Sequence, residues 1–220
     1  MIQTQCFECN MLAENCFVVS DETKECVIID CGAYFTDERK KICDYIRGHE
    51  LKPVHLLCTH GHLDHIFGNE IIYDEFGLLP EIGKADDYLI SDVEKQARDL
   101  FGTSFNLRQL AVSRWLEDGD VITFGQHQLQ AIATPGHTPG CMVFYCQEEH
   151  VAFTGDTVFR MSIGRTDFPR GSFEQMLNSL QKLSSQLNPQ TVLYTGHGPQ
   201  STIADEARYN PYFRSKKHSI

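Results

Sequence analysis

The feature that most constrains this chain is a run of metal-binding side chains directly after a predicted strand. Residues 53–58 form a short apolar segment typical of a buried strand, and residues 59–65 follow as Thr-His-Gly-His-Leu-Asp-His. Histidine is an ordinary choice for neither a turn nor a helix cap. The run therefore predicts a metal site where the strand ends, against the alternative of a polar turn with a capping aspartate.

The spacing within the run indicates two metals. His60 and His62 are two residues apart, so in an extended stretch their side chains point the same way and can bind one ion. Asp64 and His65 begin the next element and turn towards a neighbouring point. Imidazole and carboxylate ligands suit zinc, and also iron or manganese. We expect two divalent metal ions per chain, with zinc the first choice.

Four side chains cannot complete two sites, and three further candidates stand at other strand ends. His137 lies in the segment 134–140, Asp156 in 153–157 and His197 in 194–199, each beside a glycine. Glycine lets the backbone approach an ion closely. Each segment alone is equally well an ordinary turn. Together with the histidine run they predict the missing ligands.

The rest of the chain reads as alternating strands and helices. The predicted strands are two within 12–31, then 53–58, 120–124, 127–133, 141–146, 150–154 and 191–194. The predicted helices are 37–48 (with Thr36 as a candidate cap), 64–76, 84–100, 106–115, one that Ser172 starts, and 202–209. This order predicts a layered α/β domain with mixed sheet, and 220 residues fit one domain better than two.

Composition excludes several classes of protein. The net charge of −11 argues against a nucleic-acid surface and against docking on an anionic membrane. The N-terminus has no signal-peptide pattern, and no apolar stretch is long enough to span a bilayer. Nine scattered cysteines, an odd number, are read as reduced, buried side chains. We expect a cytoplasmic protein with a small-molecule substrate, either a monomer or a small homo-oligomer.

With these motifs in place, the chain resembles the metallo-β-lactamase superfamily, over about residues 5–212. The signature is matched by 59–65 together with His137, Asp156 and His197. The segments 135–140, 155–159, 162–168 and 195–199 resemble the glyoxalase II, or hydroxyacylglutathione hydrolase, branch. Full-length members of that branch carry a C-terminal helical domain that helps to bind glutathione. This chain looks like the short type, a single domain over 1–220, so the thiol carrier stays open.

The resemblance implies a fold and a set of ligands. The fold is a four-layered αβ/βα sandwich of two mixed β-sheets with outer helices. The implied first metal is held by His60, His62 and His137, the second by Asp64, His65 and His197, and Asp156 bridges them. The two carboxylates Asp64 and Asp156 are the predicted catalytic residues. Asp30, at the end of a predicted strand, either holds one of the ligands in place or is a plain turn aspartate.

The activity implied is hydrolysis of a thioester, such as S-lactoylglutathione or another S-(2-hydroxyacyl)glutathione. A hydroxide shared by two metals would attack the carbonyl carbon, and the thiolate would leave without a strong general acid. Arg165 is a candidate for binding a substrate carboxylate. The alternative is that Arg165 anchors its own loop, since Asp167 and Arg170 are near.

Two other functions fit the same residues. A persulfide dioxygenase would use one Fe(II) with two histidines and one aspartate. A structural or storage module would fill all coordination positions of its metal with protein ligands. The helical segment 84–117, with its aromatic residues, either overhangs the site as a wall or packs against the sandwich.

Overall fold

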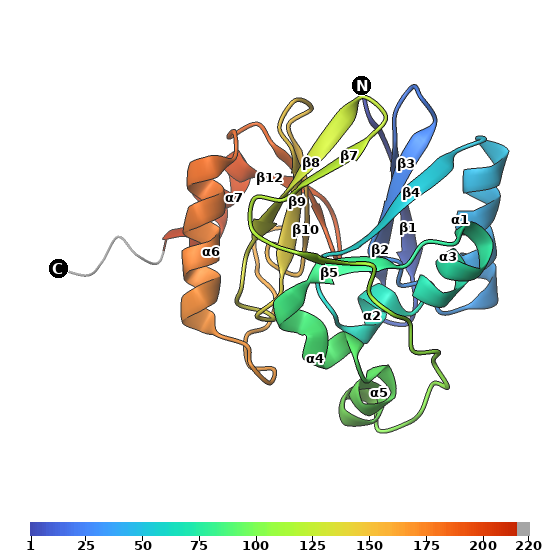
Figure 1. Ribbon diagram of the computed structural model, residues 1–220. Helices are drawn as coiled ribbons and strands as arrows, with labels where there is room; N and C mark the ends of the chain where they lie inside the picture. Colours follow the sequence, from blue (N-terminus) through green and yellow to red (C-terminus); the bar gives the residue numbers. More distant parts are fainter. Residues whose placement is uncertain (215–220) are drawn as a thin grey trace.

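The computed structural model describes residues 1–214, which form two six-stranded sheets packed face to face (Figure 1). The first sheet has the order β1 (Gln3–Cys9), β2 (Glu14–Ser20), β3 (Glu25–Ile29), β4 (Lys52–Cys58), β5 (Pro80–Gly83), β6 (Arg114–Leu116). The second has the order β12 (Ser201–Thr202), β11 (Val192–Thr195), β10 (Val151–Gly155), β9 (Met142–Cys146), β8 (His127–Ala133), β7 (Val121–Phe124). Both sheets contain parallel and antiparallel pairs, as predicted.

Helices cover the outer face of each sheet. The helices are α1 (Thr36–Gly48), α2 (Leu63–Ile66), α3 (Asn69–Phe76), α4 (Asp87–Ile90), α5 (Val93–Phe101), α6 (Phe173–Gln186) and α7 (Ile203–Tyr209). In Figure 1, α1 and α3 lie outside the first sheet, and α6 and α7 lie outside the second. The predicted four-layered αβ/βα sandwich is therefore confirmed.

The main core lies between the two sheets. Phe17 and Leu57 from the first sheet meet Leu129, Phe144 and Phe153 from the second, and all five side chains are buried. Burying each such side chain stabilises the fold by roughly 1.5–3 kcal/mol. Strand β2 is buried along its whole length because the other sheet covers one face and helices cover the other. This packing fixes the strand ends that carry the candidate ligands.

Three of the predicted helices differ from the structure. The predicted helix 84–100 is divided into a 3-10 turn (Lys84–Asp86), α4 and α5, with Ser91 and Asp92 between the two helices. Residues 106–115 are not helical: they form an extended segment that ends in β6, which pairs in parallel with β5. Neither short strand was predicted, because three or four residues carry too little pattern. The predicted helix 64–76 is divided into α2 and α3 at Phe67 and Gly68.

The predicted cap of the first helix is also wrong. Thr36 is the first helical residue of α1, and Phe35 occupies the capping position. The Glu38 carboxylate accepts hydrogen bonds from the backbone N–H groups of Tyr34 and Phe35, so a side chain within the helix caps it. The cap of α6 is as predicted, because Ser172 accepts a hydrogen bond from the Gln175 N–H.

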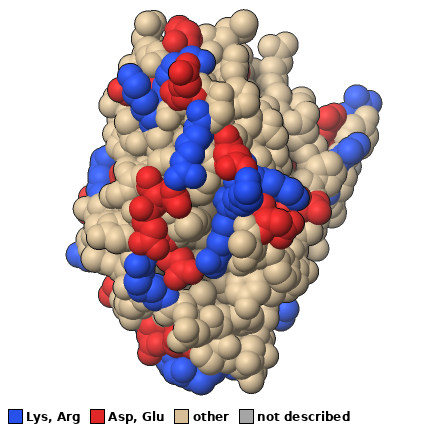
Figure 2. All heavy atoms as spheres, turned by 90° about the vertical axis from the view of Figure 1, so that its right-hand side faces the viewer, with Lys and Arg blue, Asp and Glu red and all other residues tan. Residues whose placement is uncertain are grey.

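The outer face of α1 and α3 is highly charged, with acidic and basic groups interleaved (Figure 2). Arg39 pairs with Glu70, joining α1 to α3, and Arg47 pairs with Glu75. Partly exposed ion pairs of this kind, in contact with solvent, contribute about 0–1 kcal/mol each. Among residues 1–214, no helix is long and apolar enough to cross a membrane.

Candidate metal centre

The seven predicted ligands lie together at one end of the sandwich, on segments that follow four strands, with Asp64 and His65 on the short helix α2. Strand β4 leads into the run 59–65, β8 into the loop of His137, β10 into Asp156, and β11 into His197. At the end of β10 the chain turns at Gly155, whose φ is +47°, and an added Cβ there would lie 2.2 Å from Thr59 Oγ1. Only glycine allows this approach of two ligand loops.

The first group consists of His60, His62 and His137, all buried. His62 Nδ1 lies 3.1 Å from His60 Nε2 and 2.8 Å from His137 Nε2, so three ring nitrogens face one another. Burial, together with neighbouring histidines, lowers the pKa of His60 well below its usual value and that of His62 to about 3. Both imidazoles are therefore neutral, which is the form that binds a metal.

The second group consists of Asp64, His65 and His197. Asp64 Oδ2 lies 3.3 Å from His197 Nε2 and 3.7 Å from His65 Nε2. Asp156 lies between the two groups: its Oδ1 is 3.3 Å from His65 Nε2 and its Oδ2 is 3.4 Å from His137 Nε2. One carboxylate thus faces both groups, as a bridging ligand must.

Unpaired polar atoms in the centre fit a bound cation. Among the described residues, His65 Nε2 and Asp156 Oδ1 are buried and make no hydrogen bond. Leaving such groups without a partner is unfavourable. Burial opposes the protonation of His65, yet Asp156, Asp64 and Asp30 outweigh it and raise the His65 pKa well above its usual value. A place that favours positive charge and offers imidazole and carboxylate donors fits divalent metals.

Three of the histidines are oriented by oxygen atoms on the side away from the centre. Nδ1 of His65 donates to Asp30 Oδ2 (3.0 Å), that of His137 to the Arg165 carbonyl (2.7 Å), and that of His197 to the Leu12 carbonyl (3.0 Å). Each bond fixes the ring with Nε2 directed at the centre and, in the neutral imidazole that binds a metal, places the proton on Nδ1. Asp30 also accepts hydrogen bonds from the N–H and Oγ1 of Thr59. It therefore holds a candidate ligand, His65, in place rather than acting as a plain turn aspartate.

Arg165 makes contacts within its own loop. Its guanidinium forms two hydrogen bonds of 2.9 Å to the Asp167 carboxylate and stacks over Phe168 at 4.3 Å. The ring of Phe168 in turn packs edge-on against His62 and His137. The geometry matches the loop-anchoring alternative, and binding of a substrate carboxylate by Arg165 stays a prediction.

A groove opens beside His62. Helices α4 and α5 form one wall, and the loop 168–169 forms the other. The apolar lining is Tyr88, Leu89, Leu100, Phe168 and Pro169, and the charged lining is Asp92, Lys95 and Asp99. The aromatic residues Phe101 and Phe105 do not overhang the centre, because they pack against Phe67 next to α2. The segment 84–117 therefore contributes a wall through α4 and α5 and packs against the sandwich through these rings.

Three buried polar residues near the centre were not predicted: Glu14, Asp86 and Gln96. Glu14 Oε1 lies 3.9 Å from His65 Nδ1, and burial raises the Glu14 pKa well above its usual value. The one signal for Glu14 was an acidic residue just before the apolar segment 16–19. Asp86 and Gln96 belong to no sequence motif, since the partners that they hold in the two ligand loops lie 25 to 54 residues away in the chain.

The sandwich and its centre define a class of protein, and comparison with known proteins agrees. The family model of the metallo-beta-lactamase superfamily matches residues 10–197. This chain belongs to that superfamily, as predicted.

Individual relatives are similar over nearly their whole lengths. The hydroxyacylglutathione hydrolase GloC of Haemophilus influenzae is 35% identical over 205 residues, which cover 92% of this chain and 94% of that protein. The crystal structure of BLEG-1 B3 metallo-beta-lactamase aligns with a TM-score of 0.86 and 29% identity, over 97% of this chain and 100% of the other. That of TTHA1623 in a di-iron-bound form has a TM-score of 0.83 and 33% identity, over 94% and 99%.

Proposed function

We propose that this protein is a binuclear metal-dependent hydrolase that cleaves S-(2-hydroxyacyl)glutathione or a closely related thioester. The observation that carries the proposal is the position of Asp156, with one oxygen facing His65 and the other facing His137. One carboxylate between two ligand groups supports two neighbouring ions. The similarity to a hydroxyacylglutathione hydrolase supports the substrate class.

The ligand assignment follows the two groups of side chains. His60, His62 and His137 would hold one ion and Asp64, His65 and His197 the other, with Asp156 shared. Divalent metals, when bound, lower the pKa of water towards neutrality and polarise a carbonyl group. Zinc is our first choice, and the di-iron form of TTHA1623 keeps iron as an alternative.

The chain's own residues orient the reactants. The Nδ1 hydrogen bonds of His65, His137 and His197 keep their rings directed at the centre, so little reorganisation is needed during reaction. The Asp64 side chain is 13% exposed, so its carboxylate lies at the mouth of the site, where it would hold the second ion next to the substrate. Asp64 and Asp156 are therefore the proposed catalytic carboxylates.

The groove beside His62 is the proposed place for the thiol part of the substrate. Its apolar wall can cover the methylene groups next to the sulfur, and its polar groups can meet peptide-like amides. A thiolate leaves readily without a general acid. We also propose a cytoplasmic location, because all nine cysteines are free thiols, which suits a reducing compartment.

A thioester panel with an oxygen electrode tests this function. The purified protein is offered S-D-lactoylglutathione, other acyl-glutathiones, acyl-coenzyme A and glutathione persulfide, and both thiol release and oxygen uptake are followed. We expect thiol release from hydroxyacyl thioesters without oxygen uptake. Oxygen uptake with the persulfide alone would instead favour the mononuclear iron dioxygenase, and no turnover of any compound would favour a non-catalytic metal module.

A further inference from the structure

A buried carboxylate outside the ligand set joins the two loops of the first histidine group. Asp86 ends the short 3-10 turn (Lys84–Asp86) after β5 and is fully buried. Its Oδ2 accepts hydrogen bonds from the Gly61 N–H (3.0 Å) and the Thr138 hydroxyl (2.7 Å), and its Oδ1 accepts one from the Gly140 N–H (2.7 Å). Gly61 stands between His60 and His62, whereas Thr138 and Gly140 belong to the loop of His137.

A second side chain holds the same glycine from the other side. Gln96 on α5 donates from Nε2 to the Gly61 carbonyl (2.9 Å), and its Oε1 accepts from the Leu63 N–H (2.8 Å). Both backbone polar groups of Gly61 are thus bonded to the β5–β6 insert, residues 84–113. Contact is close, since a Cβ added to Gly61 would lie 2.9 Å from the Cβ of Leu89.

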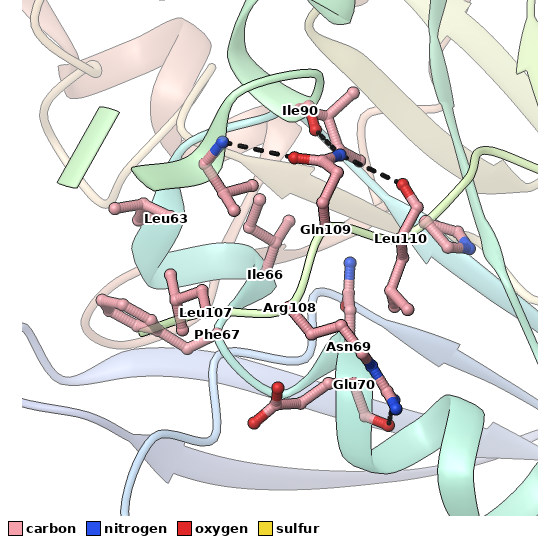
Figure 3. A pocket seen from close by; sticks show the side chains of 12 residues that line it. Leu63, Ile66, Phe67, Asn69, Glu70, Ile90, Leu107, Arg108, Gln109 and Leu110 are labelled. Carbon is pink, nitrogen blue, oxygen red and sulfur yellow. Dashed lines mark hydrogen bonds between the residues drawn. The ribbon is translucent and has the colours of Figure 1, made fainter. Parts of the chain in front are cut away.

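The β5–β6 insert is itself anchored against α2. Figure 3 shows Leu63, Ile66 and Phe67 facing Ile90 and Leu107. A small pocket lies between α2 and the insert, and the Gln109 side chain crosses it (Figure 3). This side chain donates hydrogen bonds to the carbonyls of Ile90 and Leu110 and accepts one from the Val93 N–H. The insert therefore has a fixed base from which to hold the ligand loop.

We infer that Asp86, assisted by Gln96, is the positioning residue that sets the separation of the two ligand loops of the first histidine group, and so sets metal affinity there. Three ring nitrogens bind one ion well only at a fixed spacing, and charge-assisted hydrogen bonds in a buried place resist displacement. The inference rests on the proposed metal sites. It does not depend on which substrate is cleaved.

The test measures metal affinity in proteins reduced to one site. The His197→Ala protein keeps the first group, and the His62→Ala protein keeps the second. Zn²⁺ is titrated into each metal-free protein, with and without Asp86→Asn, by calorimetry against a competing chelator. We expect Asp86→Asn to weaken Zn²⁺ binding roughly 10- to 100-fold in the His197→Ala protein, as for other partners of metal ligands. In the His62→Ala protein the change should stay within about twofold.

Equal weakening in both proteins, or no weakening in either, would overturn the inference. Asp21→Asn is the matched control, because Asp21 is also a buried carboxylate that accepts several hydrogen bonds but lies in the β2–β3 turn, away from the centre. Circular dichroism checks that each variant is folded. If Asp86→Asn does not fold, Gln96→Ala replaces it and is expected to change affinity in the same direction by a smaller factor.

Metal affinity and substrate turnover are separate readouts. Selective weakening at the first group in a protein that hydrolyses no thioester would support the role of Asp86 and contradict the proposed function. Thioester hydrolysis with equal weakening at both groups would do the reverse. Failure of the unmodified protein to bind Zn²⁺ at all would contradict both.

Discussion

Asp30 and His65 form a buried pair in which His65 Nδ1 donates to Asp30 Oδ2 over 3.0 Å. Asp30 has a left-handed backbone conformation, with φ of +52°, and also bonds to the N–H and hydroxyl of Thr59. One carboxylate therefore fixes both the start of the histidine run and the ring of a proposed ligand near its end. This pair connects the first sheet to the second group of ligands (Asp64, His65 and His197).

Replacing Asp30 by asparagine should weaken the second metal. The amide offers one acceptor oxygen instead of two, so either Thr59 or His65 loses its partner. We expect Zn²⁺ affinity at the second group to fall roughly 10- to 100-fold. Titration of the His62→Ala protein, with and without Asp30→Asn, measures this directly. An unchanged affinity would mean that His65 is held by its neighbours alone.

Replacing Asp156 by asparagine should affect both metals, because its two oxygens face different groups. Loss of a shared ligand should lower kcat/KM by more than roughly 100-fold, because removing a ligand is more damaging than removing the hydrogen-bond partner of a ligand. Metal content per chain should fall below that of the unmodified protein. Asp167→Asn, an exposed aspartate on the neighbouring loop, is the control and should retain its metal. Loss of a single metal with activity retained would contradict the bridging role.

Arg165 gives a test between loop anchoring and substrate binding. Its pairing with Asp167 is exposed, with 65% and 69% of the two side chains accessible, so water and salt screen the pair and we expect it to add little to stability. If the pair only anchors the loop, Arg165→Ala and Asp167→Ala should change KM for a carboxylate-bearing thioester equally, within about twofold. A roughly tenfold higher KM for Arg165→Ala alone would assign it to the substrate instead.

If the groove beside His62 binds the thiol part of the substrate, filling it should raise KM and leave kcat almost unchanged. Leu100 lines the groove and is 40% exposed, so a tryptophan there can fill the groove without disturbing the core. For Leu100→Trp we expect KM for S-D-lactoylglutathione to rise roughly tenfold with little change in kcat, the pattern of lost uniform binding. Steady-state kinetics decide this. A fall in kcat at constant KM would place the thiol carrier elsewhere.

We expect Asp21, which lies away from the metal centre, to make the stability of the fold depend on pH. Burial alone would raise its pKa, but hydrogen bonds from Gln126, Thr23 and His127 outweigh burial and lower the pKa below its usual value. A lowered carboxylate pKa stabilises the fold above the unfolded value of about 3.9, and this contribution is lost as pH falls below it. Asp21→Asn should cost about 1–3 kcal/mol at pH 6.

Urea unfolding of the metal-free protein between pH 6 and pH 3 measures this dependence. The stability difference between the unmodified protein and Asp21→Asn should shrink as pH falls, because at about pH 4 the unfolded chain takes up a proton at Asp21 while the folded carboxylate, with its lowered pKa, stays ionised. A difference that stays constant over this range would show that ionisation of Asp21 does not contribute.

The candidate ligands and the layered α/β order were predicted from local signals, whereas the four-layered sandwich was predicted from the resemblance to a known superfamily. The histidine run, the glycine-flanked His137, Asp156 and His197, and the apolar strand patterns are each contained in a few residues. The roles of Asp86 and Gln96 could not be found this way, since their hydrogen bonds join distant segments. The helix predicted at residues 106–115 is wrong. Apolar side chains of this segment pack against residues that are distant in the sequence, and the local sequence pattern does not reveal such contacts.

The central claim is that two metal ions share the centre built on His60–His65, His137, Asp156 and His197. Elemental analysis of the purified, unmodified protein by mass spectrometry tests it most directly. The account predicts about two divalent metal ions per chain. A single ion per chain after saturation with Zn²⁺, Mn²⁺ or Fe²⁺ would contradict it.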